Sequence, residues 1–221
     1  MSELLSHLID ANKRDWESYI HHEFVRKIGD GTLPRECFEH YLKQDYVFLI
    51  HFARAFGLAA FKSKTVAELK QAKDSLSGIV DIELGLHIQY CKSWGISESE
   101  LFATVESTAN MAYTRYVLER GMAGDLLDLN VALASCIVGY AHVANWLSKQ
   151  SFLIEENNPY LDWINMYASQ DYLSVANAHA AALDNTNLAS IDRKRLTELS
   201  NSFGAATRLE IDFWEMGLKQ S

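Results

Sequence analysis

The sequence predicts an all-α protein, a single helical bundle of seven to eight helices. Apolar residues recur at spacings of three and four along almost all of the 221 residues, and no sustained alternation of period two favours a sheet. Only 11 glycines and 2 prolines interrupt this pattern, so long helices with few turns are expected. No linker or low-complexity tract divides residues 1–221, which we therefore expect to form one domain.

Apolar periodicity and its interruptions place the helices. They are expected, in chain order, at residues 3–28 with a break near 21, 34–62, 66–94, 108–122, 125–149, 160–184 as a pair, and 191–219. The run Gly29–Gly31 supplies the stop of the first helix, and Pro34 suits the first turn of the second. A short acidic turn over Ser97–Leu101 separates the third helix from the fourth.

One helical segment, Leu129–Ser148, contains no Asp, Glu, Lys or Arg and must be tested as a membrane span. Too many polar groups interrupt it for a hydrocarbon core: Asn130, Ser135, Cys136, Gly139, His142 and Asn145. We therefore interpret it as the central helix of the bundle, whose polar residues are interior groups or part of a site.

The charge balance is acidic. Twenty basic and 29 acidic residues give a net charge of −9 and a pI near 5.3, which would repel a phosphate backbone. We expect neither a nucleic acid nor a membrane as partner. The first residues show no basic stretch, cleavage site or lipidation motif, so a cytoplasmic location is expected. The three cysteines include no CxxC pair, and neither a disulfide framework nor a zinc cluster is indicated.

Asp45 is predicted to point inward. Tyr41, Phe48, Leu49 and Phe52 lie four before and three, four and seven after it, so they share its helical face. Burying a charged carboxylate lowers the stability of the fold by roughly several kcal/mol unless the group is paired or hydrogen-bonded. Asp45 therefore either pairs with an Arg or Tyr on another helix and stabilises the fold, or it belongs to a functional site.

Glu210 repeats this pattern in the last helix. The small and apolar residues on its face are Phe203, Ala206, Phe213, Trp214 and Gly217. Two buried acids on different helices can supply one acid and one hydrogen-bond acceptor. The alternative is two separate structural ion pairs.

Cys136 lies in the middle of the uncharged helix, one turn before Tyr140 on the same face. A buried cysteine is usually a small apolar side chain. As a nucleophile it would need a lowered pKa or a base nearby.

A metal or haem site is a further alternative. Glu83 and His87 are spaced i and i+4, and His51 and His142 could approach from other helices. A carboxylate-bridged di-iron site would need a second pair of this kind, which is missing. We therefore expect no metal, and these histidines are interpreted as interior or surface groups.

Residues on several of the predicted helices resemble those of one known family and occur in the same order. They are Phe24–Pro34, Phe38, Tyr41–Leu42, Gln44–Tyr46, Ser135–Cys136, Tyr140, Trp163–Ile164, Tyr167, Glu210 and Phe213–Trp214. Together they resemble the TenA family, also called thiaminase II or aminopyrimidine aminohydrolase, along nearly the whole chain. The resemblance implies a haem-oxygenase-like fold, a homotetramer, and catalysis without a cofactor.

The implied reaction is hydrolysis at the methylene carbon attached to a pyrimidine ring. The substrate is 4-amino-5-aminomethyl-2-methylpyrimidine or thiamin, both of which yield hydroxymethylpyrimidine in thiamin salvage. By the resemblance, Cys136 is the nucleophile on ring carbon 6, Glu210 protonates ring nitrogen 1, and Asp45 holds the 4-amino group and ring nitrogen 3. The presence of Cys136 places the chain with the cysteine-bearing branch of the family.

Aromatic residues would surround the ring in this family. Tyr113 matches a tyrosine near the cysteine, Tyr140 and Tyr167 match pocket tyrosines, and Phe213 lies beside the acid. Flat side chains suit a flat heterocycle, because stacking supplies contact area at little conformational cost. Phe48 departs from the pattern: it stands where family members often have tyrosine, which keeps a ring and removes a hydroxyl.

Two other functions are compatible with the sequence. One is a protein that binds thiamin or a pyrimidine without turnover. The other is a redox enzyme of the same fold that uses haem or iron. Release of hydroxymethylpyrimidine by metal-free protein separates the expected hydrolase from both.

Overall fold

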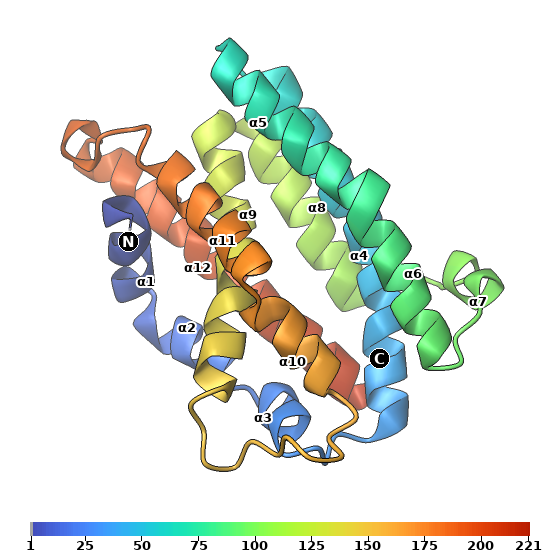
Figure 1. Ribbon diagram of the computed structural model, residues 1–221. Helices are drawn as coiled ribbons and strands as arrows, with labels where there is room; N and C mark the ends of the chain where they lie inside the picture. The colour runs from blue at the N-terminus through green and yellow to red at the C-terminus, as the bar shows by residue number, and fades with distance from the viewer. Residues whose placement is uncertain (1) are drawn as a thin grey trace. The chain divides into compact units, whose positions relative to one another are not determined.

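The computed structural model describes residues 2–221, and within that range all regular elements are helical (Figure 1). The prediction of an all-α protein is confirmed. The elements are α1 (Glu3–Ala11), α2 (Lys13–Ile20), α3 (Glu23–Gly29), α4 (Arg35–Lys62), α5 (Val66–Ser77), the π-helical turn η1 (Gly78–Glu83), α6 (Leu84–Ser93), α7 (Glu98–Phe102), α8 (Thr108–Ala123), α9 (Leu126–Leu147), α10 (Leu161–Ala168), α11 (Gln170–Leu183), the 3-10 turn η2 (Leu188–Ser190) and α12 (Arg193–Lys219).

These elements form two compact units. Unit 1 comprises the chain up to Leu33 together with Asn130–Trp214, and unit 2 comprises Pro34–Leu129 with Glu215–Ser221. The boundaries fall within α9 and α12, so these two helices contribute residues to both units. The single-domain organisation expected from the sequence stays a prediction.

The chain has more helical segments than the expected seven to eight because long helices are interrupted. The first predicted helix is broken after Ala11, where the Asn12 Nδ2 donates hydrogen bonds to the carbonyls of Leu8 (2.9 Å) and Ser200 (3.0 Å). The second break lies at His21, as predicted, and the His22 Nδ1 then accepts a hydrogen bond from the first turn of α3. Side-chain capping of the backbone thus replaces helical hydrogen bonds at both breaks.

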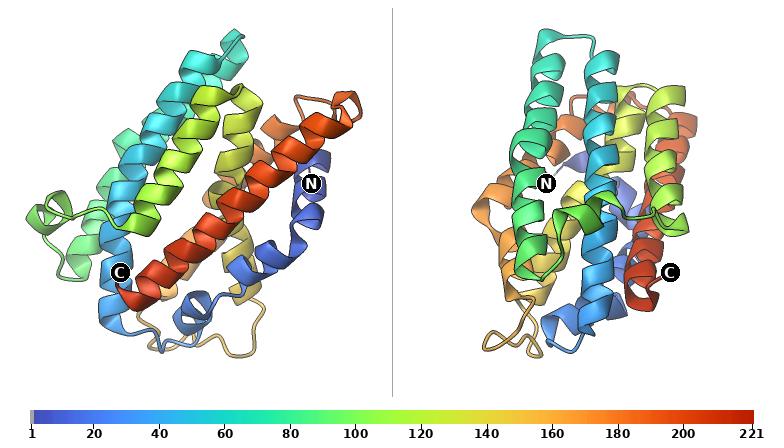
Figure 2. Two further views of the ribbon diagram at one scale, coloured as in Figure 1. Left: turned by 180° about the vertical axis from the view of Figure 1, so that it is seen from behind. Right: turned by 90° about the vertical axis from the view of Figure 1, so that its right-hand side faces the viewer.

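Unit 2 is organised around α4. The continuous run α5–η1–α6 packs along one side of α4 and α8 along another (Figure 2, right). The run matches the helix predicted at residues 66–94, with one π-helical turn inside it, and it begins with a capping box formed by Thr65 and Glu68. The predicted acidic turn is the short helix α7, capped in the same way by Ser97 and Glu100.

In unit 1, α9 and α12 run in the same direction (Figure 2, left). The Ser135 hydroxyl of α9 lies 3.1 Å from the Thr207 hydroxyl of α12, and all atoms of this contact are buried. Further along the same two helices, the rings of Tyr140 and Trp214 lie 5.2 Å apart. The two contacts follow one another in the same order along both helices and define which residues of α9 lie beside which residues of α12.

Helix α9 is, among the described residues, the one helix long and apolar enough to cross a membrane by length and composition. Of its most apolar window, 72% is buried inside the protein. The core helix of a soluble protein gives the same pattern, and the burial agrees with the interpretation of this segment as an interior helix.

Close packing at Gly139 of α9 leads to a testable prediction. A Cβ added there would lie 2.4 Å from Cε1 and 2.7 Å from the hydroxyl of Tyr19, whose side chain is fully buried. We expect Gly139→Ala to lower the free energy of unfolding by about 1–3 kcal/mol, because the ring has no room to shift. Urea unfolding measures the change.

Gly57 provides the matched control in α4, because a Cβ built there meets no atom within 4 Å. Gly57→Ala is expected to leave stability unchanged or to raise it by up to about 1 kcal/mol through helix propensity. Equal stability of the Gly139→Ala variant and wild type would contradict the packing argument.

Candidate active site

Asp45 points inward from α4, as predicted. Its side chain lies in a buried stripe with Tyr41, Phe48 and Leu49, and the residue is 7% exposed. Burial raises the pKa of Asp45 to about 7, because the charged form loses its hydration. A carboxyl group with this pKa exchanges a proton at neutral pH, which is a property of acid–base sites.

His87 of α6 is the residue that faces the carboxyl group of Asp45. Its Nδ1 lies 3.5 Å from Oδ2 of Asp45, and its Nε2 lies 2.9 Å from the carbonyl oxygen of Leu42. Burial lowers the pKa of His87, so the ring is neutral at pH 7. Because a carbonyl can only accept, the ring proton lies on Nε2 and the Nδ1 lone pair faces Asp45.

Phe48 and Tyr113 come together in unit 2. The two rings, from α4 and α8, lie 5.3 Å apart, and Phe52 stacks on Phe48 at 5.5 Å. Phe48 is one turn after Asp45, so the carboxyl group and the two rings lie along one side of α4. The structure thus brings together all three predicted residues of this unit: Asp45, Phe48 and Tyr113.

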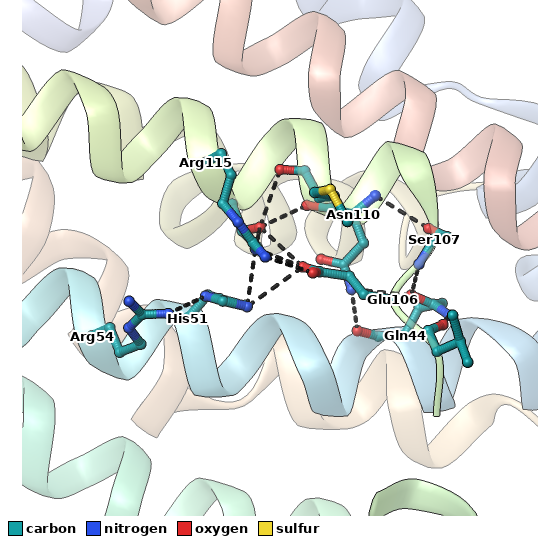
Figure 3. Close-up of polar contacts among 10 residues, drawn as sticks. Gln44, His51, Arg54, Glu106, Ser107, Asn110 and Arg115 are labelled. Carbon is teal, nitrogen blue, oxygen red and sulfur yellow. Dashed lines mark hydrogen bonds and ion pairs between the residues drawn. The ribbon is translucent and has the colours of Figure 1, made fainter. Parts of the chain in front are cut away.

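A polar network anchors the start of α8 to α4 (Figure 3). The Asn110 Nδ2 donates to the Gln44 carbonyl at 2.8 Å, and the Gln44 side chain in turn accepts from the backbone N–H of Ser107 at 3.0 Å. Gln44 is the neighbour of Asp45, and Asn110 is one turn before Tyr113. The network therefore fixes the two helices that present these site residues. Sequence patterns alone did not indicate it, because its contacts join distant segments.

His51 belongs to the same network and not to a metal cluster. Arg54 and Arg115 lie 3.1 and 3.0 Å from its two ring nitrogens, and Glu106 lies 3.4 Å away (Figure 3). Glu106 also pairs with Arg115 at 2.8 Å. In residues 2–221, no group of three or more His, Cys, Asp or Glu side chains is placed to hold a metal ion. His142, the third histidine of the metal alternative, instead packs edge-on against Trp16.

In unit 1, an aromatic cluster joins α9, α10 and α12. Tyr140 contacts Tyr167 at 4.7 Å, Trp163 at 5.9 Å and Trp214 at 5.2 Å between ring centroids. All four side chains are at least nine-tenths buried. The two predicted ring-binding tyrosines, Tyr140 and Tyr167, are therefore adjacent.

Cys136 and Glu210 lie on the stretches of α9 and α12 between the two contacts that join these helices. Cys136 is next to Ser135 and one turn before Tyr140, whereas Glu210 follows Thr207 and lies one turn before Trp214. Cys136 is half-buried and Glu210 is 1% exposed. Phe213, three residues after Glu210, is buried as well. Unit 1 thus combines a thiol, a deeply buried acid and aromatic rings, a set suited to nucleophilic and acid catalysis on a flat ring.

The chain matches one family model, described as the TENA/THI-4/PQQC family, over residues 10–220. A protein of Haemophilus influenzae, named only as uncharacterized, is 44% identical over 97% of this chain and 99% of its own length. A protein of Halalkalibacterium halodurans named aminopyrimidine aminohydrolase is 32% identical over 93% of this chain and 91% of its own.

Solved structures agree with these relatives. A protein of Silicibacter sp. TM1040, titled a TenA family transcription regulator, superposes with a TM-score of 0.91 at 42% identity and covers 98% of this chain and 97% of its own. A domain from Shewanella denitrificans described as haem-oxygenase-like superposes with a TM-score of 0.75 at 13% identity, covering 98% of this chain and 92% of its own. The second likeness concerns the fold alone and confirms the haem-oxygenase-like fold class.

Proposed function

Because the chain belongs to the TENA/THI-4/PQQC family, we propose that it is a hydrolase of thiamin salvage that releases 4-amino-5-hydroxymethyl-2-methylpyrimidine. Its substrates are 4-amino-5-aminomethyl-2-methylpyrimidine and thiamin. Relatives named aminopyrimidine aminohydrolase, which align along nearly the whole chain, support this class of reaction. The observation on which the proposal depends is that Cys136 of α9 and Glu210 of α12 lie between the same two contacts that join these helices in unit 1.

The reaction requires a reactive group that an aromatic ring does not itself provide. An aminopyrimidine expels the group on its methylene carbon poorly, because its ring electrons are delocalised. In the proposed mechanism, the Cys136 thiolate forms a bond to ring carbon 6 while Glu210 donates a proton to ring nitrogen 1. The dearomatised ring then expels the amine or thiazole as the bond from the methylene carbon to this group breaks, which leaves an exocyclic methylene group.

Water completes the turnover. Its oxygen bonds to the exocyclic methylene carbon, its proton passes to the departed amine or, with thiamin, to bulk water, and the ring double bond of the cysteine adduct forms again. The bond between Cys136 and carbon 6 then breaks, and the proton on nitrogen 1 returns to Glu210. No net redox change occurs, so hydrolysis needs only substrate and water, and we propose that no cofactor takes part.

The remaining predicted residues bind the ring. In this proposal Asp45 holds the 4-amino group and ring nitrogen 3, and the aromatic side chains stack on the heterocycle. The latter are Phe48, Tyr113, Tyr140, Tyr167 and Phe213. The raised pKa of Asp45 and its buried position support a role in polar recognition, because a purely structural carboxylate is usually stabilised in its charged form by a cation.

The test is a side-by-side assay of hydroxymethylpyrimidine release from the aminomethylpyrimidine and from thiamin. Wild-type protein treated with a chelator is expected to turn over at least one of them, and the ratio of the two kcat/KM values names the preferred substrate. Binding without release would favour the non-catalytic pyrimidine-binding protein. An iron or haem absorption spectrum together with inactivity would favour the redox alternative.

The assembly and location of the protein are part of the proposal. We propose a cytoplasmic homotetramer without nucleic-acid or membrane partners. The α5–η1–α6 run exposes large apolar side chains that a second copy of the chain could cover: Val66, Leu69, Val80, Ile82 and Leu86. The net charge of −9 opposes DNA binding. We therefore do not propose for this chain the role of transcription regulator that the Silicibacter structure carries in its name.

A further inference from the structure

The side chain of Asn110 is fully buried near the start of α8. Its Nδ2 donates to the Gln44 carbonyl at 2.8 Å and to the Gln44 Oε1 at 3.1 Å (Figure 3). Its Oδ1 accepts no hydrogen bond from any described residue. The opposite orientation of the amide would place Oδ1 against both oxygen atoms of Gln44, so the assignment of nitrogen and oxygen follows from these partners. Asn110 thus carries a buried acceptor that lacks a donor.

The polar groups beside Asn110 do not supply this donor, because their own hydrogen bonds go elsewhere. The Gln44 Nε2 donates to the Val105 carbonyl at 2.9 Å, and the Thr114 hydroxyl donates to the backbone carbonyl of Asn110 at 2.8 Å. The Ser107 hydroxyl caps α8, where it accepts from the backbone N–H of Asn110 at 3.2 Å. Native proteins leave very few buried polar atoms unpaired, since each such atom lowers stability. An unpaired buried oxygen therefore points to a donor from outside the chain.

Asn110 lies beside the predicted ring-binding residues of unit 2. Its bond to the Gln44 carbonyl places the amide next to α4 between Gln44 and Phe48, because each carbonyl of an α-helix points toward the next turn. Phe48 contacts Tyr113, which follows Asn110 by three residues on the same face of α8. Asp45 is the neighbour of Gln44 and shares the buried stripe of Phe48. The unpaired oxygen therefore belongs to the part of unit 2 that presents the carboxyl group and the two rings.

A 4-aminopyrimidine supplies the kind of donor that this oxygen lacks. Its amino group has two N–H bonds in the plane of the ring, one on the side of ring nitrogen 3 and the other on the side of ring carbon 5. A carboxyl group that binds the edge with ring nitrogen 3 takes only the first of them. The oxygen of an amide is a suitable acceptor for the second. A 4-oxo ring would instead place its own acceptor against these oxygens, so a second acceptor also favours amino over oxo substituents.

We propose that Asn110 is a further substrate-binding residue, whose Oδ1 accepts the N–H of the 4-amino group that faces ring carbon 5. Asp45 binds the edge formed by the other N–H and ring nitrogen 3. This inference rests on the proposed function, since it names a second polar contact for the same ring. The bonds to Gln44 and the cap of α8 hold the Asn110 amide in place before a ligand arrives, so binding requires little further ordering.

The test compares two ligands that differ only in the amino group. Affinities for the product, 4-amino-5-hydroxymethyl-2-methylpyrimidine, and for 5-hydroxymethyl-2-methylpyrimidine are measured by calorimetry in wild type and Asn110→Ala. The substitution is expected to lower affinity for the product about tenfold, the effect of one lost hydrogen bond, and affinity for the ring without the amino group by no more than about twofold. The ratio of the two affinities, in which general effects on the site cancel, then falls.

Gln44→Ala provides the matched control. It removes the side-chain bonds to Asn110 and Ser107 but leaves the Oδ1 of Asn110 in the protein. We expect it to lower affinity for both ligands by the same factor and to keep the wild-type ratio. Asn110→Ser is measured if Asn110→Ala does not fold, because a hydroxyl can still donate to the Gln44 carbonyl but is shorter than the amide. Circular dichroism confirms that each variant is folded.

The outcomes separate the inference from the proposed function. The same affinity ratio in wild type and in the Asn110 variants would overturn the contact while leaving the hydrolase intact; this result is expected if Oδ1 only binds a buried water molecule. Wild-type protein that binds the product no better than the ring without the amino group would overturn it as well. If wild type neither binds the product nor turns over either substrate, the proposed function fails, and the ligand assigned to Asn110 fails with it.

Discussion

Replacing Cys136 by serine should abolish turnover of both pyrimidine substrates while leaving their binding nearly unchanged. Serine has almost the same volume, but its hydroxyl is a much weaker nucleophile at neutral pH than a thiolate. We expect kcat to fall by at least about 10³-fold, the scale on which the loss of a covalent nucleophile acts in other hydrolases. Release of hydroxymethylpyrimidine measures kcat, and calorimetry with the product measures binding.

Cys37 offers the matched control for this substitution. Its Sγ is buried and donates to the Leu218 carbonyl at 3.2 Å, a contact that a serine hydroxyl can also make. Cys37→Ser should retain the wild-type rate. A Cys136→Ser variant with near wild-type turnover would rule out the covalent adduct, and loss of activity in both variants would indicate a general structural effect.

Glu210→Gln should also remove most of the activity, because glutamine keeps the shape of the side chain and has no proton to donate to ring nitrogen 1. General acid catalysis typically contributes about 10²–10⁴-fold, and we expect kcat to fall within this range. The effect on KM should be small, since the amide can still donate a hydrogen bond to the ring. Steady-state kinetics on the preferred substrate separate the two parameters.

Glu198→Gln serves as the control on the same helix. Glu198 is exposed and pairs with Lys194 at 4.0 Å, and exposed pairs of this kind contribute little to stability. Its substitution should change neither kcat nor the unfolding midpoint. If Glu210→Gln instead raised KM and spared kcat, Glu210 would be a binding residue and not the acid.

The helical class and the inward faces were predictable because both follow from local spacing. Asp45 and Glu210 lie three or four residues from aromatic side chains, and the structure buries both acids as expected. The approximate bounds of α4, α8 and α12 follow from the same periodicity. The roles proposed for Cys136 and Glu210 rest on a family resemblance, and the structure adds that both residues lie between the same two contacts of α9 and α12.

Other features depend on contacts between distant segments and could not be predicted. The break at Asn12 depends on a hydrogen bond to the Ser200 carbonyl, 188 residues away. From the sequence, Glu83 is only a possible metal ligand four residues before His87, and its half-buried position is a feature of the structure. The π-helical turn is also hidden, since the apolar pattern of residues 66–94 reads as one continuous α-helix.

The π-helical turn η1 determines where this part of the chain can gain or lose a residue without disturbing the packing of α6 on α4. In an α-helix, gain or loss of one residue rotates every later side chain by about 100° around the axis. Such a change within α5 or α6 would turn His87 and Cys91 away from α4. A π turn differs from an α turn by accommodating one additional residue. We therefore expect one-residue length differences between relatives in this region to fall within Gly78–Glu83.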